Sequence, residues 1–318
     1  RMVSMIRERA DWCISRQRHW GLPIPVFYCE DCKKVVCTPE TIENVSKIFA
    51  EKGSNAWFDM DAVDLLPGGF TCPHCGGNHF YKETDTLDGW FDSGSTHIAS
   101  MELDAPGCWP ASLYLEGGDQ YRGWFQSSLL TGVAVKGSAP YESVLTHGWT
   151  VDGEGKAMHK SLGNSILPED LIPKYGADLI RLWAASADYH LDMRCSDAIF
   201  KQLSDKYLKI RNTARFILGN LIGFEPNDSI EFKDMDELDR WAVIRLNQLV
   251  EKCLAAYDRY EFHTVTYAIH NFCVVDMSNF YLDIIKDRLY CEAEGSQLRR
   301  SSQSAMYMVL DGIVRLLA

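Results

Sequence analysis

Two pairs of closely spaced cysteines constrain the fold of this chain more than any other feature of its sequence. Cys29 and Cys32 lie in YCEDCKK, and Cys72 and Cys75 lie in TCPHCGG. A turn with two intervening residues points both thiolates at one centre, and two such turns supply four tetrahedral zinc ligands. Because four thiolates complete the coordination shell, we expect one structural zinc ion. Four unrelated cysteines, or His74 as a substitute ligand, are the alternatives.

The cysteine pairs belong to a small module that we place at residues 25–85. The run PETIENVSKIFAEKG predicts one amphipathic helix inside it, ended by Gly53. The remaining cysteines stand mostly alone in apolar or helical contexts, and the total of 11 is odd. This usage is typical of a reducing compartment, so we expect a cytoplasmic protein and not a secreted disulfide scaffold.

Composition excludes several classes of protein. Of the 318 residues 46% are hydrophobic, which is enough to build sizeable cores. No apolar run reaches the ~18–20 residues that cross a membrane, and the N-terminal stretch lacks the apolar centre of a signal peptide. The formal charge of −12 argues against a general nucleic-acid coat protein but allows a local basic patch.

Residues 86–198 alternate between strand-like and helix-like runs. SLYLEGGDQ predicts a strand that opens into a glycine turn, RGWFQSSLLTGVAV a helix, and SVLTHGWTV the next strand. This order is typical of a parallel sheet in an α/β domain. A helix-like run, PEDLIPKYGADLIRLWAASA, follows. The aspartates of DTLDGWFDSGS, Asp85, Asp88 and Asp92, are interpreted as capping and loop-bonding groups in preference to paired acids for hydrolysis.

From residue 199 onward, apolar residues recur at helical spacing. Four long amphipathic helices are predicted, the last two at about 263–290 and 297–318, and they indicate an α-helical bundle or part of one. The last apolar face continues to the end of the sequence without a cap, and the first residues begin inside a charged helical segment. We therefore expect this sequence to be part of a longer polypeptide.

The loop GEGKAMHKSLGN, residues 153–164, is the most unusual segment of the chain. It joins a predicted strand to a predicted helix and carries three glycines and two lysines. Its polar residues predict a phosphate clamp, because lysine is a flexible point charge and glycine lets a loop close and reopen. The position after a sheet strand is where α/β folds bind ligands. A solvated surface turn is the alternative. The clamp residues are Lys156, His159, Lys160 and Ser161.

Several stretches resemble the class I aminoacyl-tRNA synthetases, and among them the isoleucyl-tRNA synthetases. The loop is similar to the family's KMSKS signature, with AMHKS at residues 157–161. The resemblance covers nearly the whole chain and also rests on DWCISRQRHWGLPIP, DTLDGWFDSGST, LYLEGGDQYRGWFQSSL, LTHGWTVDGEG and YGADLIRLWAASADY. It implies activation of isoleucine by ATP, with magnesium, to isoleucyl-adenylate, and transfer to the 3′ end of tRNA(Ile).

The resemblance also implies roles for individual residues. Lys160 matches the family's second lysine, whereas Ala157 stands at the first, so Lys156 is the candidate replacement; His159 stands where the signature has serine. The residues expected to bind the adenylate and the nucleotide are Glu116, Gly117, Asp119, Gln120, His147, Gly148 and Met158. The residues expected to wall the isoleucine side-chain pocket are Trp90 and Trp124, for which simple core packing is the alternative.

The resemblance divides the chain into five segments. They are a catalytic-domain segment at 1–24, the zinc-binding insertion at 25–85, the second half of a Rossmann-like parallel-sheet catalytic domain with the KMSKS-type loop at 86–165, a stem-contact region at 166–198 and a partial α-helical anticodon-binding domain at 199–318. The family's HIGH motif and editing domain do not occur in this sequence, so we expect the chain alone to be inactive.

The resemblance also implies partners. We expect a monomer whose helical part faces tRNA through Lys201, Lys206, Lys209, Arg211 and Arg215. Two other functions stay open: a zinc-stabilised tRNA-binding module without catalysis, and a valyl-type synthetase, which WFDSGS disfavours.

Overall fold

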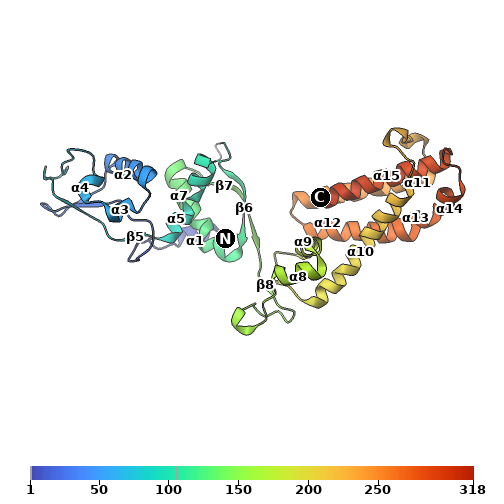
Figure 1. Cartoon of the computed structure of the whole chain (residues 1–318), viewed down its shortest axis with the longest axis horizontal. Coiled ribbons are helices and arrows are strands. Elements are labelled where there is room, and N and C mark those ends of the chain that lie inside the picture. Colours follow the sequence, from blue (N-terminus) through green and yellow to red (C-terminus); the bar gives the residue numbers. More distant parts are fainter. Residues whose placement is uncertain (1, 105–106) are drawn as a thin grey trace. The chain divides into compact units, whose positions relative to one another are not determined.

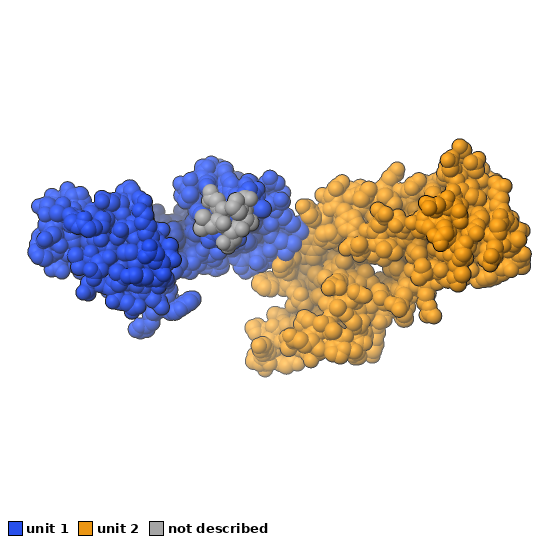
Figure 2. Space-filling model, turned by 45° about the horizontal axis from the view of Figure 1, so that its top comes forward, with its two compact units in different colours: residues 1–146 blue, residues 147–318 orange. Residues whose placement is uncertain are grey.

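The chain divides into two units in the computed structural model, which describes residues 2–104 and 107–318 (Figures 1 and 2). Unit 1 is Arg1–Thr146 and unit 2 is His147–Ala318. The boundary falls within the segment 86–165 that the sequence predicts as one domain. It lies just before the loop GEGKAMHKSLGN at residues 153–164, called here the lysine-bearing loop. No helix in the described ranges is both long and apolar enough to cross a membrane.

The cysteine module is built on a small antiparallel sheet in unit 1. Its strands are ordered β3–β2–β4, with bounds Val35–Val36, Phe27–Cys29 and Phe80–Lys82. The predicted helix is confirmed as α2, Pro39–Lys52. Thr38 and Thr41 cap its start reciprocally, and Gly53 ends it at φ 79°. The short helices α3, Ala56–Asp59, and α4, Ala62–Leu65, help to enclose a core around fully buried Trp57 and Phe27.

The rest of unit 1 contains the predicted strand, turn, helix and strand. β6, Ala111–Gly117, and β7, Tyr141–His147, are neighbours in one sheet, and α7, Trp124–Lys136, connects them. Helix α5, Gly89–Gly94, packs on α7, where a Cβ at Gly94 would lie 2.9 Å from the Ser127 backbone. Glycine therefore permits this close approach. The remaining elements are α1 Met2–Arg7, β1 Ser15–Arg16, which pairs antiparallel with β5 Thr86–Leu87, α6 Thr96–Ile98 and a π-helical segment Ala99–Asp104.

Unit 2 begins with a pair of short strands and two helices. β8, Thr150–Val151, runs parallel to β9, Met193–Arg194. The predicted strand SVLTHGWTV is interrupted between β7 and β8, because the chain crosses the Leu191 backbone at Gly148, where a Cβ would lie only 2.6 Å away. The single helix-like run at 168–187 forms two helices, α8 Pro168–Tyr175 and α9 Ala177–Ser186, separated at Gly176 with φ 81°.

The helical bundle confirms the α-helical prediction for the C-terminal part. Its long helices are α10 Asp197–Asn220, α11 Glu237–Asp258, α12 Phe262–Asn271 and α15 Gln297–Leu317. The predicted helix at 263–290 is not continuous: α12 passes into a π-helical segment, Phe272–Tyr281, and then into α13 Leu282–Ile284 and α14 Lys286–Cys291. Thr213 of α10 donates a hydrogen bond to the Cys273 carbonyl in the π-helical segment at 3.4 Å.

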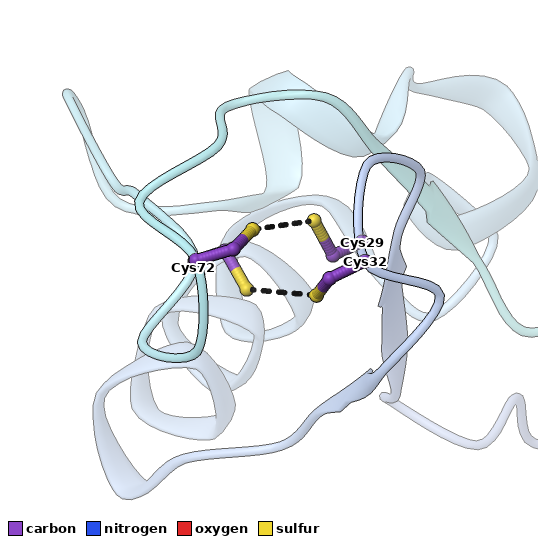
Figure 3. Close-up of side chains that lie close together, drawn as sticks. Cys29, Cys32 and Cys72 are labelled. Carbon is purple, nitrogen blue, oxygen red and sulfur yellow. Dashed lines mark hydrogen bonds between the residues drawn. The ribbon is translucent and has the colours of Figure 1, made fainter.

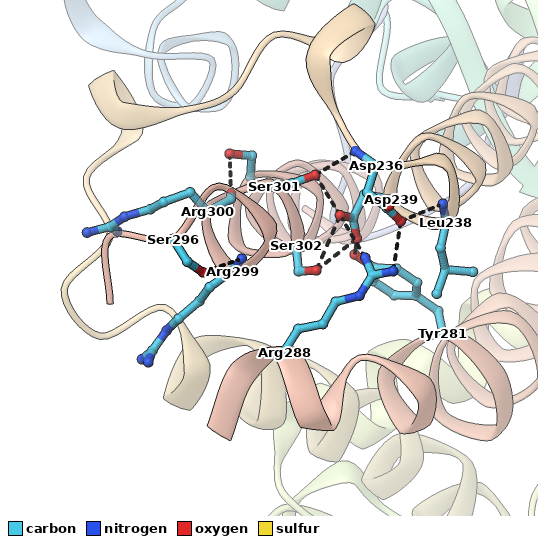
Figure 4. Close-up of polar contacts among 11 residues, drawn as sticks. Asp236, Leu238, Asp239, Tyr281, Arg288, Ser296, Arg299, Arg300, Ser301 and Ser302 are labelled. Carbon is cyan, nitrogen blue, oxygen red and sulfur yellow. Dashed lines mark hydrogen bonds and ion pairs between the residues drawn. The ribbon is translucent and has the colours of Figure 1, made fainter. Parts of the chain in front are cut away.

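A buried carboxylate of α11 joins the π-helical segment, α14 and α15 of the bundle (Figure 4). Asp239 of α11 has no exposed surface, and it accepts hydrogen bonds from Tyr281 and Ser301, both at 2.6 Å. Ser302 donates to it at 3.0 Å, and an Arg288 nitrogen lies 3.3 Å away. Burial, followed by the Asp239 charge, raises the pKa of Tyr281 well above its usual value. The first turns of α15 therefore bury a polar face and not an apolar one.

Candidate functional site

The four cysteines of the two predicted pairs lie together in unit 1 (Figure 3). Their Sγ atoms all lie within 4.8 Å of one another, with 3.6 Å between Cys29 and Cys75 and 3.7 Å between Cys32 and Cys72. In a tetrahedron with metal–sulfur bonds of about 2.3 Å, the sulfur atoms are about 3.8 Å apart. The spacing of this four-cysteine cluster therefore fits a single four-coordinate metal ion.

The two cysteine turns share one backbone geometry. The residue after the second cysteine has a positive φ in both, 59° at Lys33 and 75° at Gly76. Its N–H donates to the carbonyl of the first cysteine, at 2.9 Å from Lys33 to Cys29 and 2.8 Å from Gly76 to Cys72. His74, the alternative ligand, donates its backbone N–H to Cys72 Sγ at 3.4 Å. Both turns thus present two thiols each to the same point.

Burial and hydrogen bonds act in opposite directions on these thiols. Burial disfavours the thiolate of Cys72, but N–H donors at His74 and Cys75 outweigh it and lower its pKa to about 7. The Gly77 N–H favours the thiolate of Cys75, whereas burial and the neighbouring sulfurs raise its pKa to about 12. Four thiolates can coexist here only beside a cation that offsets their repulsion.

The predicted pocket walls, Trp90 and Trp124, come from the neighbouring helices α5 and α7 of unit 1. Trp124 stacks on Tyr114 with ring centroids 4.1 Å apart and donates its Nε1–H to the Ser93 carbonyl at 2.8 Å. Trp90 is 47% exposed, and its ring edge would lie 2.9 Å from a Cβ at Gly123. Packing therefore fixes Trp124, whereas Trp90 keeps an accessible apolar face.

The turn after β6 carries the residues predicted to hold the adenylate. It is a 3₁₀ turn, Gly118–Arg122, and it leaves the carboxylates of Glu116 and Asp119 exposed, whereas Gly117 is buried. Gln120 Oε1 accepts the Trp124 backbone N–H at 3.0 Å, and its Nε2 donates to Asp119 Oδ2 at 3.2 Å. Gln120 thus ties the turn to the start of α7, beside the tryptophans.

The three aspartates of DTLDGWFDSGS lie in different environments. Asp88 caps α5 by accepting the Trp90 N–H at 3.0 Å, and it pairs with Arg16 at 2.5 Å. Asp85 accepts a hydrogen bond from the Gln17 side chain at 2.7 Å. These contacts support the capping and loop-bonding interpretation. Asp92 Oδ1 is buried with no hydrogen-bond partner among the described residues, and burial, with a smaller effect from Asp88, raises the pKa of Asp92.

The lysine-bearing loop, residues 153–164, follows Asp152 and folds back on itself in unit 2. Val151 and Ala157 form an antiparallel bridge, and the chain reverses through Gly155, whose φ is 87°. Asp152 Oδ1 accepts the backbone N–H groups of Glu154 at 3.0 Å and Lys156 at 2.8 Å. The first half of the loop is therefore a hydrogen-bonded turn built around one carboxylate.

Asn164 closes the second half of the loop. Its Oδ1 accepts the His159 N–H at 2.9 Å, and its Nδ2 donates to Asp152 Oδ2 at 2.8 Å and to the Ala157 carbonyl at 3.1 Å. The hydrogen bond from Asn164, the largest cause, lowers the pKa of Asp152. Sequence reasoning does not single out either residue. The available signal is their type, because Asp and Asn bond turn backbones, at the two ends of a glycine-rich segment.

The residues predicted to act on phosphate all have exposed side chains in this loop. Lys156 Nζ lies 2.8 Å from Glu154 Oε2, but the two side chains are 71% and 76% exposed, so this ion pair contributes little. Lys160 begins a 3₁₀ turn, Lys160–Leu162, that Gly163 ends at φ 66°. The loop therefore offers two accessible ammonium groups, with the His159 ring and the Ser161 hydroxyl beside Lys160 in the chain.

The predicted nucleotide-binding residues of unit 2 flank this loop. His147 Nδ1 lies 2.7 Å from the Gly148 carbonyl, and the Gly148 N–H donates to the Tyr189 carbonyl at 2.8 Å. Met158 is partly buried against an apolar cluster of α8, α9 and α10, so it anchors the loop to these helices. The predicted site residues are thus divided between the units: the four cysteines, the tryptophans and the adenylate turn belong to unit 1, and the lysine-bearing loop with His147 and Gly148 belongs to unit 2.

The five cationic side chains predicted to face tRNA lie on α10, and all are exposed. Lys201 is 3.0 Å from Asp197, which also pairs with Lys174. Lys206 lines a small cavity of about 80 Å³ between α9, α10 and α12. The α10 surface therefore combines partly neutralised and accessible positive charge.

Two family models match the chain. Residues 1–196 match the model of tRNA synthetases class I (I, L, M and V), and residues 239–318 match that of the anticodon-binding domain of tRNA ligase. Two curated relatives are named isoleucine–tRNA ligase. The one from Caldanaerobacter subterraneus subsp. tengcongensis is 55% identical over 100% of this chain and 34% of its own length. The one from Caldicellulosiruptor saccharolyticus is 56% identical over 100% of this chain and 35% of its own length. The chain therefore spans 34–35% of these relatives.

Solved structures share the fold at low sequence identity. The LeuRS of Agrobacterium radiobacter K84, in a ternary complex with tRNA and LeuAMS, has a TM-score of 0.70 and 19% identity over 96% of this chain and 39% of that one. Methionyl-tRNA synthetase of Mycobacterium tuberculosis, bound by methionyl-adenylate, has a TM-score of 0.58 and 16% identity over 90% and 62%. The sequence resemblance stated above is thus confirmed by sequence relatives and by fold.

Proposed function

The chain belongs to the class I tRNA synthetases, and on that premise we propose that it forms part of an isoleucine–tRNA ligase. Such an enzyme converts isoleucine and ATP to isoleucyl-adenylate and passes the acyl group to the 3′ end of tRNA(Ile). The observation that carries the proposal is the loop 153–164, which resembles the KMSKS signature and exposes Lys156 and Lys160. The identity to isoleucine–tRNA ligases over the whole chain favours isoleucine over valine, leucine and methionine.

Activation joins the isoleucine carboxylate to the α-phosphate of ATP and releases pyrophosphate. Negative charge builds up on the departing phosphates, so positive charge held beside them accelerates the step. In this proposal Lys160 supplies that charge, and Lys156 serves in place of the lysine that Ala157 lacks. His159 and Ser161 donate hydrogen bonds to the same phosphates, and magnesium accompanies ATP. The chain forms no covalent intermediate, so catalysis consists of positioning and charge stabilisation.

The amino-acid and nucleotide sites follow from the contacts within each unit. The fixed ring of Trp124 and the accessible ring of Trp90 suit a branched aliphatic side chain. Glu116 and Asp119 suit the ammonium and the ribose hydroxyls of the adenylate, with Gln120 orienting Asp119 and Gly117 allowing close approach. His147, Gly148 and Met158 take the nucleotide side. β6 and β7 then belong to a Rossmann-like parallel sheet, whose strand ends bind the ligand.

The four-cysteine cluster is assigned a structural zinc ion. The sulfur spacing and the matching turns support this assignment, and four thiolates leave no open coordination position. The ion would hold the two cysteine turns of the module together without touching the substrates.

Transfer RNA is the proposed partner of unit 2. The exposed cations of α10 and the match of residues 239–318 to an anticodon-binding model support this assignment. We propose that the enzyme acts as a cytoplasmic monomer. The odd number of cysteines and their mostly isolated positions support a reducing compartment.

Amino-acid-dependent exchange of pyrophosphate into ATP by the complete gene product tests the function. We expect exchange with isoleucine and slower exchange with valine, by about 10–200-fold in kcat/KM. One methylene is worth only ~1–3 kcal/mol, and the isoleucine enzyme is itself the standard example of this limit. A preference for valine would indicate a valyl-type enzyme. Binding of tRNA without exchange would indicate a binding module in place of a ligase.

A further inference from the structure

Two side chains that the proposed reaction does not use hold the backbone next to both lysines of the loop. We propose that Asp152 and Asn164, hydrogen-bonded to each other and called here the Asp–Asn clasp, are positioning residues for Lys156 and Lys160. The catalytic consequence rests on the proposed function. The structural part rests only on hydrogen bonds within unit 2, so the two can be tested separately.

The clasp holds Lys156 through its backbone. Asp152 Oδ1 accepts the Lys156 N–H at 2.8 Å, and the Asp152 N–H donates to the Lys156 carbonyl at 2.9 Å. Both polar backbone groups of Lys156 are therefore bound to one residue. Among the described residues, the Lys156 side chain is paired only with exposed Glu154, so it can leave for a stronger anion while its backbone stays in place.

The clasp also holds the backbone on both sides of Lys160, through Asn164. Asn164 Oδ1 accepts the N–H of His159, the residue before Lys160, at 2.9 Å, and Asn164 Nδ2 donates to the Ala157 carbonyl at 3.1 Å. The Lys160 carbonyl accepts the Gly163 N–H at 3.2 Å, which places Asn164 directly after the turn that carries Lys160. The bond of 2.8 Å between Asn164 and Asp152 then joins the two halves.

The clasp is attached to packed structure through the strand before it and through Met158. Asp152 directly follows Val151, which is buried at the end of β8 and whose carbonyl accepts the Cys195 N–H at 2.8 Å. Between the two halves, Met158 packs into the apolar cluster of α8, α9 and α10. A lysine head group on four methylenes can reach many points, so its useful placement depends on a fixed backbone. The clasp supplies that fixed backbone for both lysines at once.

Exchanging the two side chains tests the clasp. In Asp152→Asn two amide donors face each other, and in Asn164→Asp two carboxylates do, so each single variant breaks the central hydrogen bond. The double variant Asp152→Asn/Asn164→Asp restores a donor facing an acceptor; its remaining defect is a carboxylate oxygen facing the Ala157 carbonyl, where Asn164 Nδ2 donates at 3.1 Å in the wild type. Asp170→Asn, at an exposed carboxylate in the first turn of α8, makes the same chemical change outside the clasp and is the control.

The readouts are pyrophosphate exchange by the complete gene product and hydrogen exchange of peptides that cover residues 152–164. Each single variant should lower kcat by about 10²-fold and raise KM for pyrophosphate, with KM for isoleucine unchanged, because misplaced lysines contact only phosphate. The kcat of the double variant should be at least about tenfold higher than that of either single variant, as expected for coupled residues. Loop amides should exchange faster in the single variants and slow again in the double variant.

The outcomes separate the clasp from the proposed function. Single variants that match the control in exchange kinetics would overturn the positioning role, and so would a double variant that is no better than the singles. If none of the amino acids supports pyrophosphate exchange by the wild-type protein, the proposed function fails. Hydrogen exchange then decides the clasp alone: loss of protection in the single variants with recovery in the double supports it, and unchanged protection refutes it.

Discussion

At the scale of single residues, Asp239 shows how one buried charge can organise several helices. Its carboxylate is fully buried and is bonded by Tyr281, Ser301 and Ser302, with Arg288 alongside. A buried charge is costly unless hydrogen bonds and an opposite charge compensate it, and here each oxygen has partners. The charge therefore fixes which faces of α11, α15 and the π-helical segment can meet.

Removing this carboxylate should destabilise the bundle strongly. Asp239→Ala leaves the buried Tyr281 and serine hydroxyls without their acceptor and leaves Arg288 with only its pair to Asp236 among the described residues, so we expect a loss of about 3–5 kcal/mol in the free energy of unfolding, measured by urea denaturation. Asp311→Ala is the matched control, because it breaks the exposed pair with Arg315 and should cost about 0–1 kcal/mol. Equal effects of the two substitutions would contradict the assignment of a structural role to the buried charge.

At the scale of elements, the sequence predicts the helices and strands whose periodicity is strong, and it misses what depends on contacts between distant segments. Helices α2, α10 and α11 lie where the apolar spacing places them. The break at Gly148 is set by the Leu191 backbone, which no local pattern reveals. The buried serines at the start of α15 likewise look like a solvated face until Asp239 is placed beside them.

The cysteine module should depend on its metal. Purified protein should contain about one zinc per chain, and Cys72→Ser should lose the metal and unfold the module at residues 25–85, because metal binding and folding are coupled in such sites. Cys37→Ser is the matched control, since Cys37 is exposed and lies outside the four-cysteine cluster. Metal analysis measures the zinc content of each variant, and hydrogen exchange of the module measures whether it is folded. Wild-type protein without zinc and with four freely reactive thiols would defeat the assignment.

At the scale of the whole molecule, the candidate site is only partly readable from sequence. A motif can find the cysteines, the lysines and the tryptophans, because residue type and spacing alone indicate their roles. The roles of Asp152 and Asn164 depend on hydrogen bonds to backbone groups, and these hydrogen bonds form only when the loop is folded. The motif does find Gln120, but the link that its side chain makes between the adenylate turn and α7 is visible only in the folded structure.

Binding of tRNA should be electrostatic and should depend on α10. Changing Lys206, Lys209, Arg211 and Arg215 together to Ala should weaken binding and make the slope of log K against log salt shallower by about 0.7–0.9 for each phosphate that is no longer neutralised. Lys47→Ala, on α2 of the cysteine module, should leave both quantities unchanged. Filter binding of tRNA(Ile) at several salt concentrations provides the measurement. An unaltered slope in the fourfold variant would show that these cations are merely solvated.

In the proposed reaction a flexible lysine offsets the negative charge that develops as ATP is split. Isoleucine-dependent pyrophosphate exchange by the complete gene product carrying Lys160→Ala tests it most directly, with Lys233→Ala, an exposed lysine paired to Glu231, as the control. We expect a fall in kcat of about 10²–10³-fold with an unchanged KM for isoleucine. Exchange at the full wild-type rate in Lys160→Ala would contradict it.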